Sequence, residues 1–185
     1  MQREVKFAGF GGQGILSAGK FYGEAGMEEG KEVAWVPSYG PEMRGGTAYC
    51  TVVVADHPIG SPIVNNPSDL VAMNRPSLEK FEGTVREGGF ILINSSLIPD
   101  RVKRKDVIEV LVPCNDEAIR IGNNRGANMV VLGAYTVCSG VIKLETVIEI
   151  VRREFQRKPQ FIESNIACIE RGAEIAREAL EKVGV

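Results

Sequence analysis

The stretch VKFAGFGGQG, from Val5 to Gly14, decides the fold because a short apolar run passes directly into a glycine-rich turn. The apolar run over residues 5–10 predicts a buried strand, and the glycines predict a tight turn after it. Apolar residues at helical spacing from Ile15 to Glu29 predict that the turn opens into a helix. A strand, a glycine turn and a helix in this order begin a Rossmann-like α/β unit.

Further elements alternate between strands and helices in the first two thirds of the chain. Apolar runs predict strands at 32–36, 47–55, 70–73, 90–94 and 107–112, and helical spacing predicts helices at 76–86, 127–139, 144–155 and 166–180. The helix-poor passage from Val33 to Asp56 predicts that one strand there pairs antiparallel. The expected fold is a three-layer α/β/α sandwich with a mixed, mostly parallel sheet and a helical C-terminal third, formed by residues 1–185 as a single domain.

Three glycines lie along one face of the first predicted helix, at Gly19, Gly23 and Gly26. Glycine inside a helix costs up to ~1 kcal/mol relative to alanine, so we expect another backbone to approach this face closely. Packing on the sheet beneath the helix is the simpler interpretation, and contact with another subunit is the alternative.

The composition is that of a soluble globular protein, with 44% hydrophobic and 25% charged residues. Lys and Arg number 22 against 24 Asp and Glu, which gives a net charge of −2. A dedicated nucleic-acid binder usually carries a basic excess, whereas the short basic run from Lys103 to Lys105 is most simply a solvated loop. We therefore expect no nucleic-acid partner.

Four cysteines are scattered among apolar neighbours without any CxxC pair, at Cys50, Cys114, Cys138 and Cys168. Such cysteines are usually buried free thiols, which predicts a reducing compartment and disfavours an iron–sulfur or zinc site on this chain. The chain begins with a strand-like run that leaves no room for a signal peptide, and its longest uncharged stretch is too short to cross a bilayer. The expected location is the cytoplasm, with no membrane partner.

The motif Gly9-Phe-Gly-Gly-Gln-Gly14 has the spacing of a GxGxxG phosphate loop and the expected place between a strand and a helix. Glycines in such loops let the backbone approach an anion, and the helix N-terminus supplies free N–H groups. A dinucleotide site would also place an acidic residue at the end of the second strand, where this chain has Trp35, Val36 and Pro37. The candidate residues for binding another phosphate group, or for a tight turn against neighbouring protein, are Gly11, Gly12, Gln13 and Gly14.

A second loop concentrates a phenol, a carboxylate and a guanidinium among glycines, with candidate binding residues at Tyr39, Glu42, Arg44, Gly45 and Gly46. Arg44 can form a two-pronged bond to a phosphate or carboxylate, or it can pair internally with Glu42. The sequence leaves both interpretations open. Gly45 and Gly46 would let a ligand or another backbone come close.

No pattern of residues predicts a complete catalytic set. His57, the only histidine, lies between Asp56 and Pro58 in a predicted turn, where a solvated residue is a simpler interpretation than a general base. Without a nucleophile near it, a Ser-His-Asp or Cys-His arrangement has no support. The sequence therefore predicts a compact α/β protein with a glycine loop, no catalytic residue and no metal ligand of its own.

The resemblance to a known family rests on four motifs, which are Gly9-Phe-Gly-Gly-Gln-Gly14, Pro37-Ser-Tyr-Gly-Pro-Glu-Met-Arg-Gly-Gly46, Pro58-Ile-Gly-Ser-Pro62 and Asn128-Met-Val-Val-Leu-Gly-Ala134. Together they resemble the gamma subunit of the 2-oxoacid:ferredoxin oxidoreductases, equivalent to the third domain of single-chain pyruvate:ferredoxin oxidoreductase. The resemblance spans nearly the whole chain, and the second motif is its most specific part. The Pro-Glu-Met in that motif favours the pyruvate, branched-chain or 2-oxoglutarate branches over the beta subunit of indolepyruvate:ferredoxin oxidoreductase.

The resemblance implies a part in a larger oxidoreductase that acts on the oxo group of its donor, with an iron–sulfur protein as acceptor. Such complexes use thiamine diphosphate and Mg to decarboxylate a 2-oxoacid, pass electrons through iron–sulfur clusters to ferredoxin, and release the acyl group on coenzyme A. This chain has neither the Gly-Asp-Gly stretch of a thiamine site nor a cysteine cluster. The resemblance therefore places these cofactors on alpha, beta and delta-type sister subunits.

For this chain, the resemblance implies a structural role with no activity and no bound cofactor when it is alone. The glycine loop and Arg44 become candidates for positioning the nucleotide end of coenzyme A, or for contacts with a sister subunit. An isolated chain can form a homodimer over the surface that its partners would cover. The alternatives are a freestanding dinucleotide-binding oxidoreductase, the beta subunit of an indolepyruvate:ferredoxin oxidoreductase, and a purely structural or regulatory module.

Overall fold

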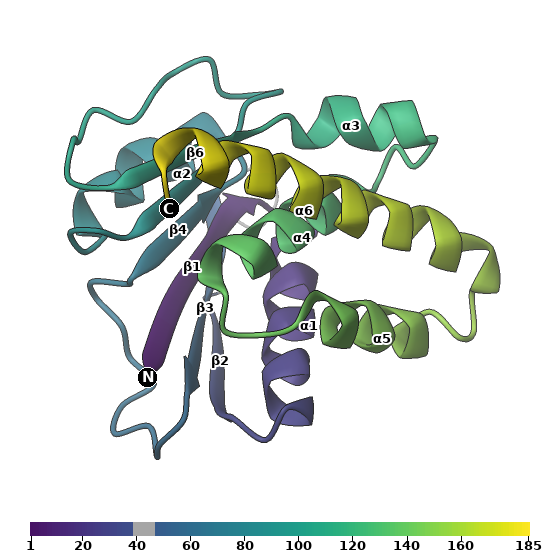
Figure 1. Cartoon of the computed structure of the whole chain (residues 1–185), viewed down its shortest axis with the longest axis horizontal. Helices are drawn as coiled ribbons and strands as arrows, with labels where there is room; N and C mark the ends of the chain where they lie inside the picture. Colours follow the sequence, from purple (N-terminus) through teal and green to yellow (C-terminus); the bar gives the residue numbers. More distant parts are fainter. Residues whose placement is uncertain (39–46) are drawn as a thin grey trace.

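The computed structural model describes residues 1–38 and 47–185, which form one six-stranded sheet and six α-helices (Figure 1). The strands are β1 (Gln2–Phe10), β2 (Glu32–Ser38), β3 (Thr47–Ala55), β4 (Asp69–Ala72), β5 (Phe90–Asn94) and β6 (Ile108–Val112). The helices are α1 (Ile15–Glu28), α2 (Arg75–Phe81), α3 (Cys114–Ile121), α4 (Ala127–Ser139), α5 (Leu144–Glu154) and α6 (Ile162–Val183). Short 3₁₀ turns at Glu82–Thr84 and Pro159–Phe161 adjoin α2 and α6.

The sheet is mixed, with the strand order β2-β3-β1-β4-β5-β6. Strands β1, β4, β5 and β6 run parallel to one another, whereas β3 is antiparallel to both β1 and β2. Only residues 39–46 separate β2 from β3, and such a connection is shorter than the dozen or more residues of a parallel crossover, which agrees with the antiparallel pairing of these two strands. The predicted mixed, mostly parallel sheet is confirmed.

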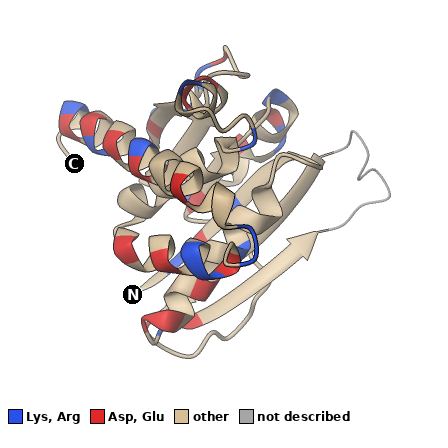
Figure 2. Cartoon of the chain, turned by 90° about the vertical axis from the view of Figure 1, so that its right-hand side faces the viewer, with Lys and Arg blue, Asp and Glu red and all other residues tan. Residues whose placement is uncertain are grey.

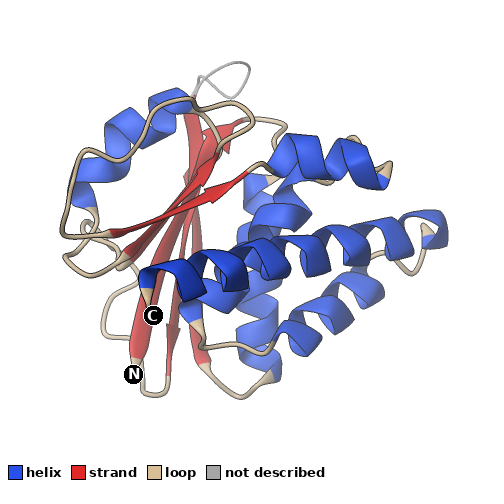
Figure 3. Ribbon diagram, turned by 45° about the horizontal axis from the view of Figure 1, so that its top comes forward, coloured by secondary structure: helices blue, strands red, loops and turns tan. Residues whose placement is uncertain are grey.

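The two faces of the sheet carry very different layers of helix, as Figure 3 shows. Alternate side chains of β1 point to opposite faces. Phe7 belongs to a large core cluster with α1, α3, α4, α5 and α6, and Ala8 belongs to a smaller cluster with α2. The predicted α/β fold with its Rossmann-like first unit and helical C-terminal third is confirmed.

The glycine face of α1 packs on the sheet. A Cβ atom at Gly19 would lie 2.4 Å from Cys50 Sγ, and one at Gly26 would lie 2.9 Å from Val33 Cγ2. Cβ atoms essentially never come that close to another heavy atom, so these two positions need glycine at the observed helix–sheet distance. The simpler interpretation of the glycine stripe is confirmed, and contact of this face with another subunit is excluded because β2 and β3 already cover it.

Helices α4 and α6 also approach each other through glycine. A Cβ atom at Gly133 would lie 1.9 Å from the carbonyl oxygen of Ile169, and one at Gly172 would lie 1.8 Å from that of Val130. The two helices are therefore in backbone contact, and α6 lies outside α4 as a further helical layer (Figure 1).

Two helices differ from the sequence-based expectation. The helix expected over 76–86 ends at Phe81 and continues as a 3₁₀ turn, and its start is fixed by Asn74, whose side chain accepts a hydrogen bond from Ser77 N–H. Helix α3 (Cys114–Ile121) was not predicted, because it is short and buries only Cys114, Glu117 and Ala118.

Charged residues of both signs mix along the helices (Figure 2). Among the described residues, no helix is both long and apolar enough to span a bilayer.

Candidate functional site

The glycine loop connects β1 to α1 and is built on two left-handed residues, Gly12 (φ +92°) and Gly14 (φ +73°). Only glycine adopts this region without strain. Gly14 is also the N-cap of α1, where no side chain caps the helix and no acidic residue occupies the first turn. The positive end of the α1 dipole is thus left without a negative side chain of its own helix.

Gln13 fixes the shape of this loop. Its side-chain oxygen accepts a hydrogen bond from Phe10 N–H at 2.6 Å, and its amide nitrogen donates to the carbonyl oxygen of Met73 at 3.1 Å. Asn74 donates a further bond to the same Gln13 oxygen at 3.3 Å. Gln13 therefore ties the glycine loop to the end of β4, which is a positioning role.

Asn128 joins the start of α4 to the same loop. Its Nδ2 donates to the carbonyl oxygen of Gly14 at 3.2 Å, and a Cβ atom at Gly14 would lie 2.4 Å from that nitrogen. A further amide lies at the end of β5, where Asn94 Nδ2 donates to Asn115 Oδ1 at 2.8 Å. Amides thus line the carboxyl ends of the parallel strands, which is where open α/β sheets bind ligands.

The sequence-based analysis did not single out Asn74, Asn94 or Asn115. Asn74 lies two residues after the end of β4, and Asn94 is the last residue of β5. Asn115 lies in the first turn of α3, directly after β6. A polar residue at the end of an apolar strand was the available signal, because these ends meet at one edge of a parallel sheet.

The second predicted loop lies outside the described residues, so the roles of Tyr39, Glu42, Arg44, Gly45 and Gly46 stay predictions. Its flanks are described. Strand β2 ends with Ser38 paired to Tyr49, and Thr47 pairs with Phe10, which borders the glycine loop. Both loops therefore leave the sheet at the same end.

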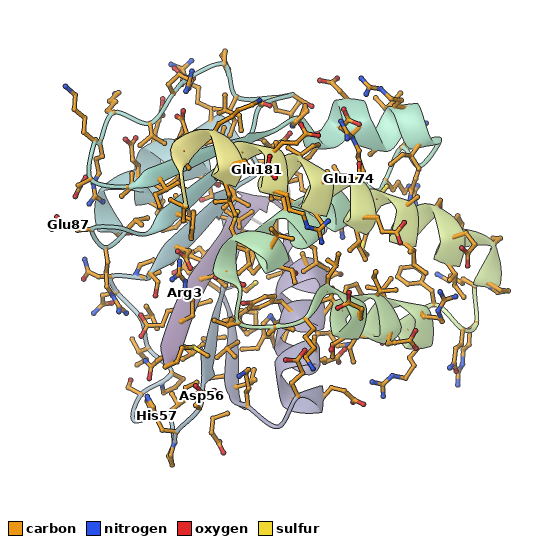
Figure 4. All side chains as sticks on the ribbon, in the orientation of Figure 1. Arg3, Asp56, His57, Glu87, Glu174 and Glu181 are labelled. Atoms are coloured by element: carbon orange, nitrogen blue, oxygen red, sulfur yellow. The ribbon has the colours of Figure 1, made fainter. Side chains whose placement is uncertain are left out.

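The other side chains with reactive groups are His57, which lies far from this edge of the sheet, and the four cysteines, which are buried. His57 lies in an exposed turn after β3, at the opposite end of the molecule from the glycine loop (Figure 4). All four cysteines are buried and free, as predicted. Burial raises the pKa of Cys50 and Cys138 to about 12 and that of Cys168 to about 11, so these thiols stay protonated at neutral pH.

A cavity of about 560 Å³ adjoins the amide edge between α1, the start of α4 and the start of α6. Asn128 and Ser17 connect it to the glycine loop and α1, and Phe155 and Asn165 line its other side. In the part of the chain that the structure describes, the site thus consists of an open helix N-terminus, a row of amides and an adjoining cavity.

These features define an α/β domain that presents a glycine loop at the carboxyl end of its sheet and offers a surface for binding. Residues 4–175 match the family model described as pyruvate ferredoxin/flavodoxin oxidoreductase, and the chain belongs to this family.

Relatives with similar sequences and folds are subunits of oxidoreductases. The chain is 41% identical over 179 residues to ketoisovalerate oxidoreductase subunit VorA of Methanothermobacter marburgensis, covering 96% of this chain but 37% of VorA. It is 32% identical over 183 residues to 2-oxoglutarate synthase subunit KorC of Methanocaldococcus jannaschii, covering 96% of both. The crystal structure of the keto/oxoacid ferredoxin oxidoreductase gamma subunit from Geobacter sulfurreducens superposes with a TM-score of 0.83 at 28% identity, covering 95% of this chain and 99% of that one. The predicted resemblance to this family of subunits is confirmed.

Proposed function

We propose that this chain is the gamma subunit of a thiamine diphosphate-dependent 2-oxoacid:ferredoxin oxidoreductase. The complex would convert a 2-oxoacid, coenzyme A and two oxidised ferredoxins to acyl-CoA, CO₂ and two reduced ferredoxins. The observation that carries the proposal is the family match over residues 4–175 together with near-complete coverage of a gamma subunit of similar fold.

The chain would contribute structure and binding to this reaction. The described residues contain no group of three His, Cys, Asp or Glu side chains that could hold a metal ion, so they do not fit Mg or an iron–sulfur cluster. We assign thiamine diphosphate, Mg and the clusters to alpha, beta and delta-type sister subunits, and contact with ferredoxin to the assembled complex.

The glycine loop and Arg44 would help to position coenzyme A through its phosphates. The α1 N-terminus has no acidic residue in its first turn, which supports anion binding there. The loop that carries Arg44 leaves the sheet beside the glycine loop, which brings the flanks of both candidate segments together.

Co-expression with the adjacent reading frames tests the subunit assignment. The purified complex should show 2-oxoacid-dependent dye reduction that requires coenzyme A, whereas the isolated chain should be colourless and inactive. Turnover by the isolated chain, or a tightly bound flavin or iron–sulfur chromophore on it, would contradict the assignment.

Arg44→Ala in the complex tests the coenzyme A role. We expect the KM for coenzyme A to rise about tenfold with little change in kcat, because one charge-assisted hydrogen bond is lost. Lys105→Ala, an exposed position in another loop, is the matched control. An unchanged KM with impaired assembly would make Arg44 a subunit-contact residue instead.

A further inference from the structure

The face of the sheet that α2 covers holds a buried ammonium group without a carboxylate beside it. Lys6 is 6% exposed, and its Nζ lies 4.4 Å from the centroid of the Phe81 ring and 5.1 Å from that of Tyr49. Within residues 1–38 and 47–185, no Asp or Glu lies within ion-pair distance of this group. Buried charges in proteins are normally paired, and the aromatic rings replace such a partner only in part.

A second ammonium group shares the same two rings. The rings of Tyr49 and Phe81 meet edge to face with their centroids 5.1 Å apart. Lys80 Nζ lies 5.3 Å from the centroid of Phe81 and 6.0 Å from that of Tyr49. Because Lys80 is an exposed residue, the ring pair lies next to the surface of the molecule. Burial lowers the pKa of Lys6, Tyr49 opposes this shift, and the charge of Lys80 adds to it.

The carboxylates close to this lysine pair in β1 and α2 are already engaged elsewhere. Each of them contacts a different basic side chain or accepts a hydrogen bond from a backbone N–H. The pairs are Glu4 with Arg86, Glu79 with Arg75 at 3.0 Å, and Glu82 with the N–H of Lys103 at 2.6 Å. The described part of the chain therefore concentrates positive charge at the two rings and supplies no negative charge to match it.

A buried ammonium group at this position lowers the stability of the isolated chain. An apolar side chain of similar volume would stabilise the fold at least as well. The short helix α2 packs on this face, whereas α1, α3, α4, α5 and α6 cover the opposite face (Figure 3). Complementary charge defines what fits beside Lys6 and Lys80, and a carboxylate is the negative group that the side chains of a partner protein carry.

From this arrangement we infer that Lys6 and Lys80 form a docking site for an Asp or Glu side chain of a sister subunit. The inference rests on the proposed function, because it assigns the carboxylate to another subunit of the complex. That carboxylate pairs with both ammonium groups beside the rings of Tyr49 and Phe81 and is removed from water when the subunits meet. Such a pair accelerates association and fixes the orientation of the two subunits.

Biolayer interferometry tests the inference by measuring how tightly the purified full chain binds the other subunits of the co-expressed complex. We expect Lys6→Met and Lys80→Met each to weaken binding about tenfold or more. Added salt should weaken binding of the wild-type chain more than binding of the variants. The urea midpoint of isolated Lys6→Met should equal or exceed that of the wild type, so the lost binding cannot come from unfolding. Lys182→Met, an exposed position on α6 at the opposite face, is the matched control.

The outcomes separate the docking site from the subunit assignment. A wild-type chain that does not bind the other subunits would contradict both. If the wild-type chain binds and the Lys6→Met and Lys80→Met variants bind equally well, the docking site alone is overturned. A lower urea midpoint for Lys6→Met would show that the ammonium group is paired within this chain, which would also overturn the docking site.

Carbodiimide cross-linking of the assembled complex identifies the partner carboxylate. The reagent joins a lysine amine to a carboxylate in direct contact, forming an amide with loss of water. Mass spectrometry should find Lys6 or Lys80 joined to an Asp or Glu of a sister subunit, and Lys80→Met should remove any link at residue 80. A link between two copies of this chain would replace the sister subunit with a second copy and overturn the inference.

Discussion

Asp69 and Lys6 are buried charged residues on opposite faces of the same sheet. Hydrogen bonds surround the carboxylate of Asp69, whereas aromatic rings surround the ammonium group of Lys6. Asp69 is fully buried on the face covered by α4. Its carboxylate accepts hydrogen bonds from Arg3 Nε at 2.7 Å and Nη2 at 2.9 Å, from the Tyr135 hydroxyl at 2.8 Å and from Phe90 N–H at 2.9 Å. A charge on this face is thus completely paired.

Lys6, on the face covered by α2, is 6% exposed and has a different environment. Its Nζ lies 4.4 Å from the centroid of the Phe81 ring and 5.1 Å from that of Tyr49. No carboxylate of the described residues lies within ion-pair distance, and Lys80 approaches the same rings. Burial, followed by the nearby Lys80 charge, lowers the pKa of Lys6, while Tyr49 opposes this shift.

The difference between the two faces follows from what covers them. Helices α1, α3, α4, α5 and α6 cover the Asp69 side, so a charge there must be matched by specific hydrogen bonds. One short helix covers the Lys6 side, where aromatic rings provide the main favourable contact for the ammonium group. The first side should therefore be sensitive to any loss of fit, and the second should tolerate substitution.

The largest effect should come from the helix contact that seals the Asp69 side. In Gly172→Ala the new Cβ atom would lie 1.8 Å from the Val130 carbonyl oxygen, a backbone atom that cannot rotate away. Alanine improves helix propensity by ~1 kcal/mol, but separating α4 from α6 should cost more, for a net loss of about 3 kcal/mol. Urea unfolding followed by circular dichroism measures this loss.

Gly83→Ala provides the control for that experiment, because a Cβ atom at Gly83 meets nothing within 4 Å. We expect it to change the free energy of unfolding by less than ~0.5 kcal/mol. Equal effects of the two substitutions would mean that α4 and α6 do not need backbone contact.

A slightly smaller effect should follow from removing the charge of Asp69. Asp69→Asn leaves the guanidinium of Arg3 without its carboxylate, and breaking a buried pair typically costs about 3 kcal/mol. Tyr135→Phe removes a single hydrogen bond to Asp69 and should cost ~1 kcal/mol. Thermal unfolding measures both losses of stability. Asp116→Asn, a substitution of an exposed residue, is the control. If Asp69→Asn were no more harmful than Asp116→Asn, complete pairing would not be what stabilises this face.

The sequence predicted local features of this fold well. The passage from β1 through the glycine loop to α1 follows from hydrophobic spacing and glycine positions within a few residues. The mixed sheet follows from the helix-poor sequence between Val33 and Asp56. The sheet-facing role of Gly19 and Gly26 follows from the cost of glycine inside a helix.

The features that distinguish the two faces could not be predicted in the same way. Arg3 and Asp69 are separated by 66 residues, and their pairing depends on β1 and β4 being neighbours in the sheet. Lys6 occupies one position in an apolar strand, and its aromatic neighbours come from β3 and α2. The cavity likewise combines Ser17 with Asn165, which only the packing of α6 near α1 brings together. Long-range pairing, which short sequence patterns do not encode, decides all three.

The smallest effect should come from Lys6, and its sign should be opposite to that of Asp69. Lys6→Met keeps the volume in contact with Phe81 and Tyr49 and removes a buried ammonium group, so at neutral pH it should raise the stability by ~1 kcal/mol. Because the pKa of Lys6 is lowered in the folded state, the unfolded chain binds more protons between that pKa and the usual value of 10.5. The wild-type protein should therefore gain stability as the pH rises through this range, and the advantage of Lys6→Met should shrink. Urea unfolding at several pH values measures both trends, with Lys105→Met, an exposed position in another loop, as control. A loss of stability in Lys6→Met at neutral pH, or an advantage that grows with pH, would show that the ammonium group is paired as well as the carboxylate of Asp69.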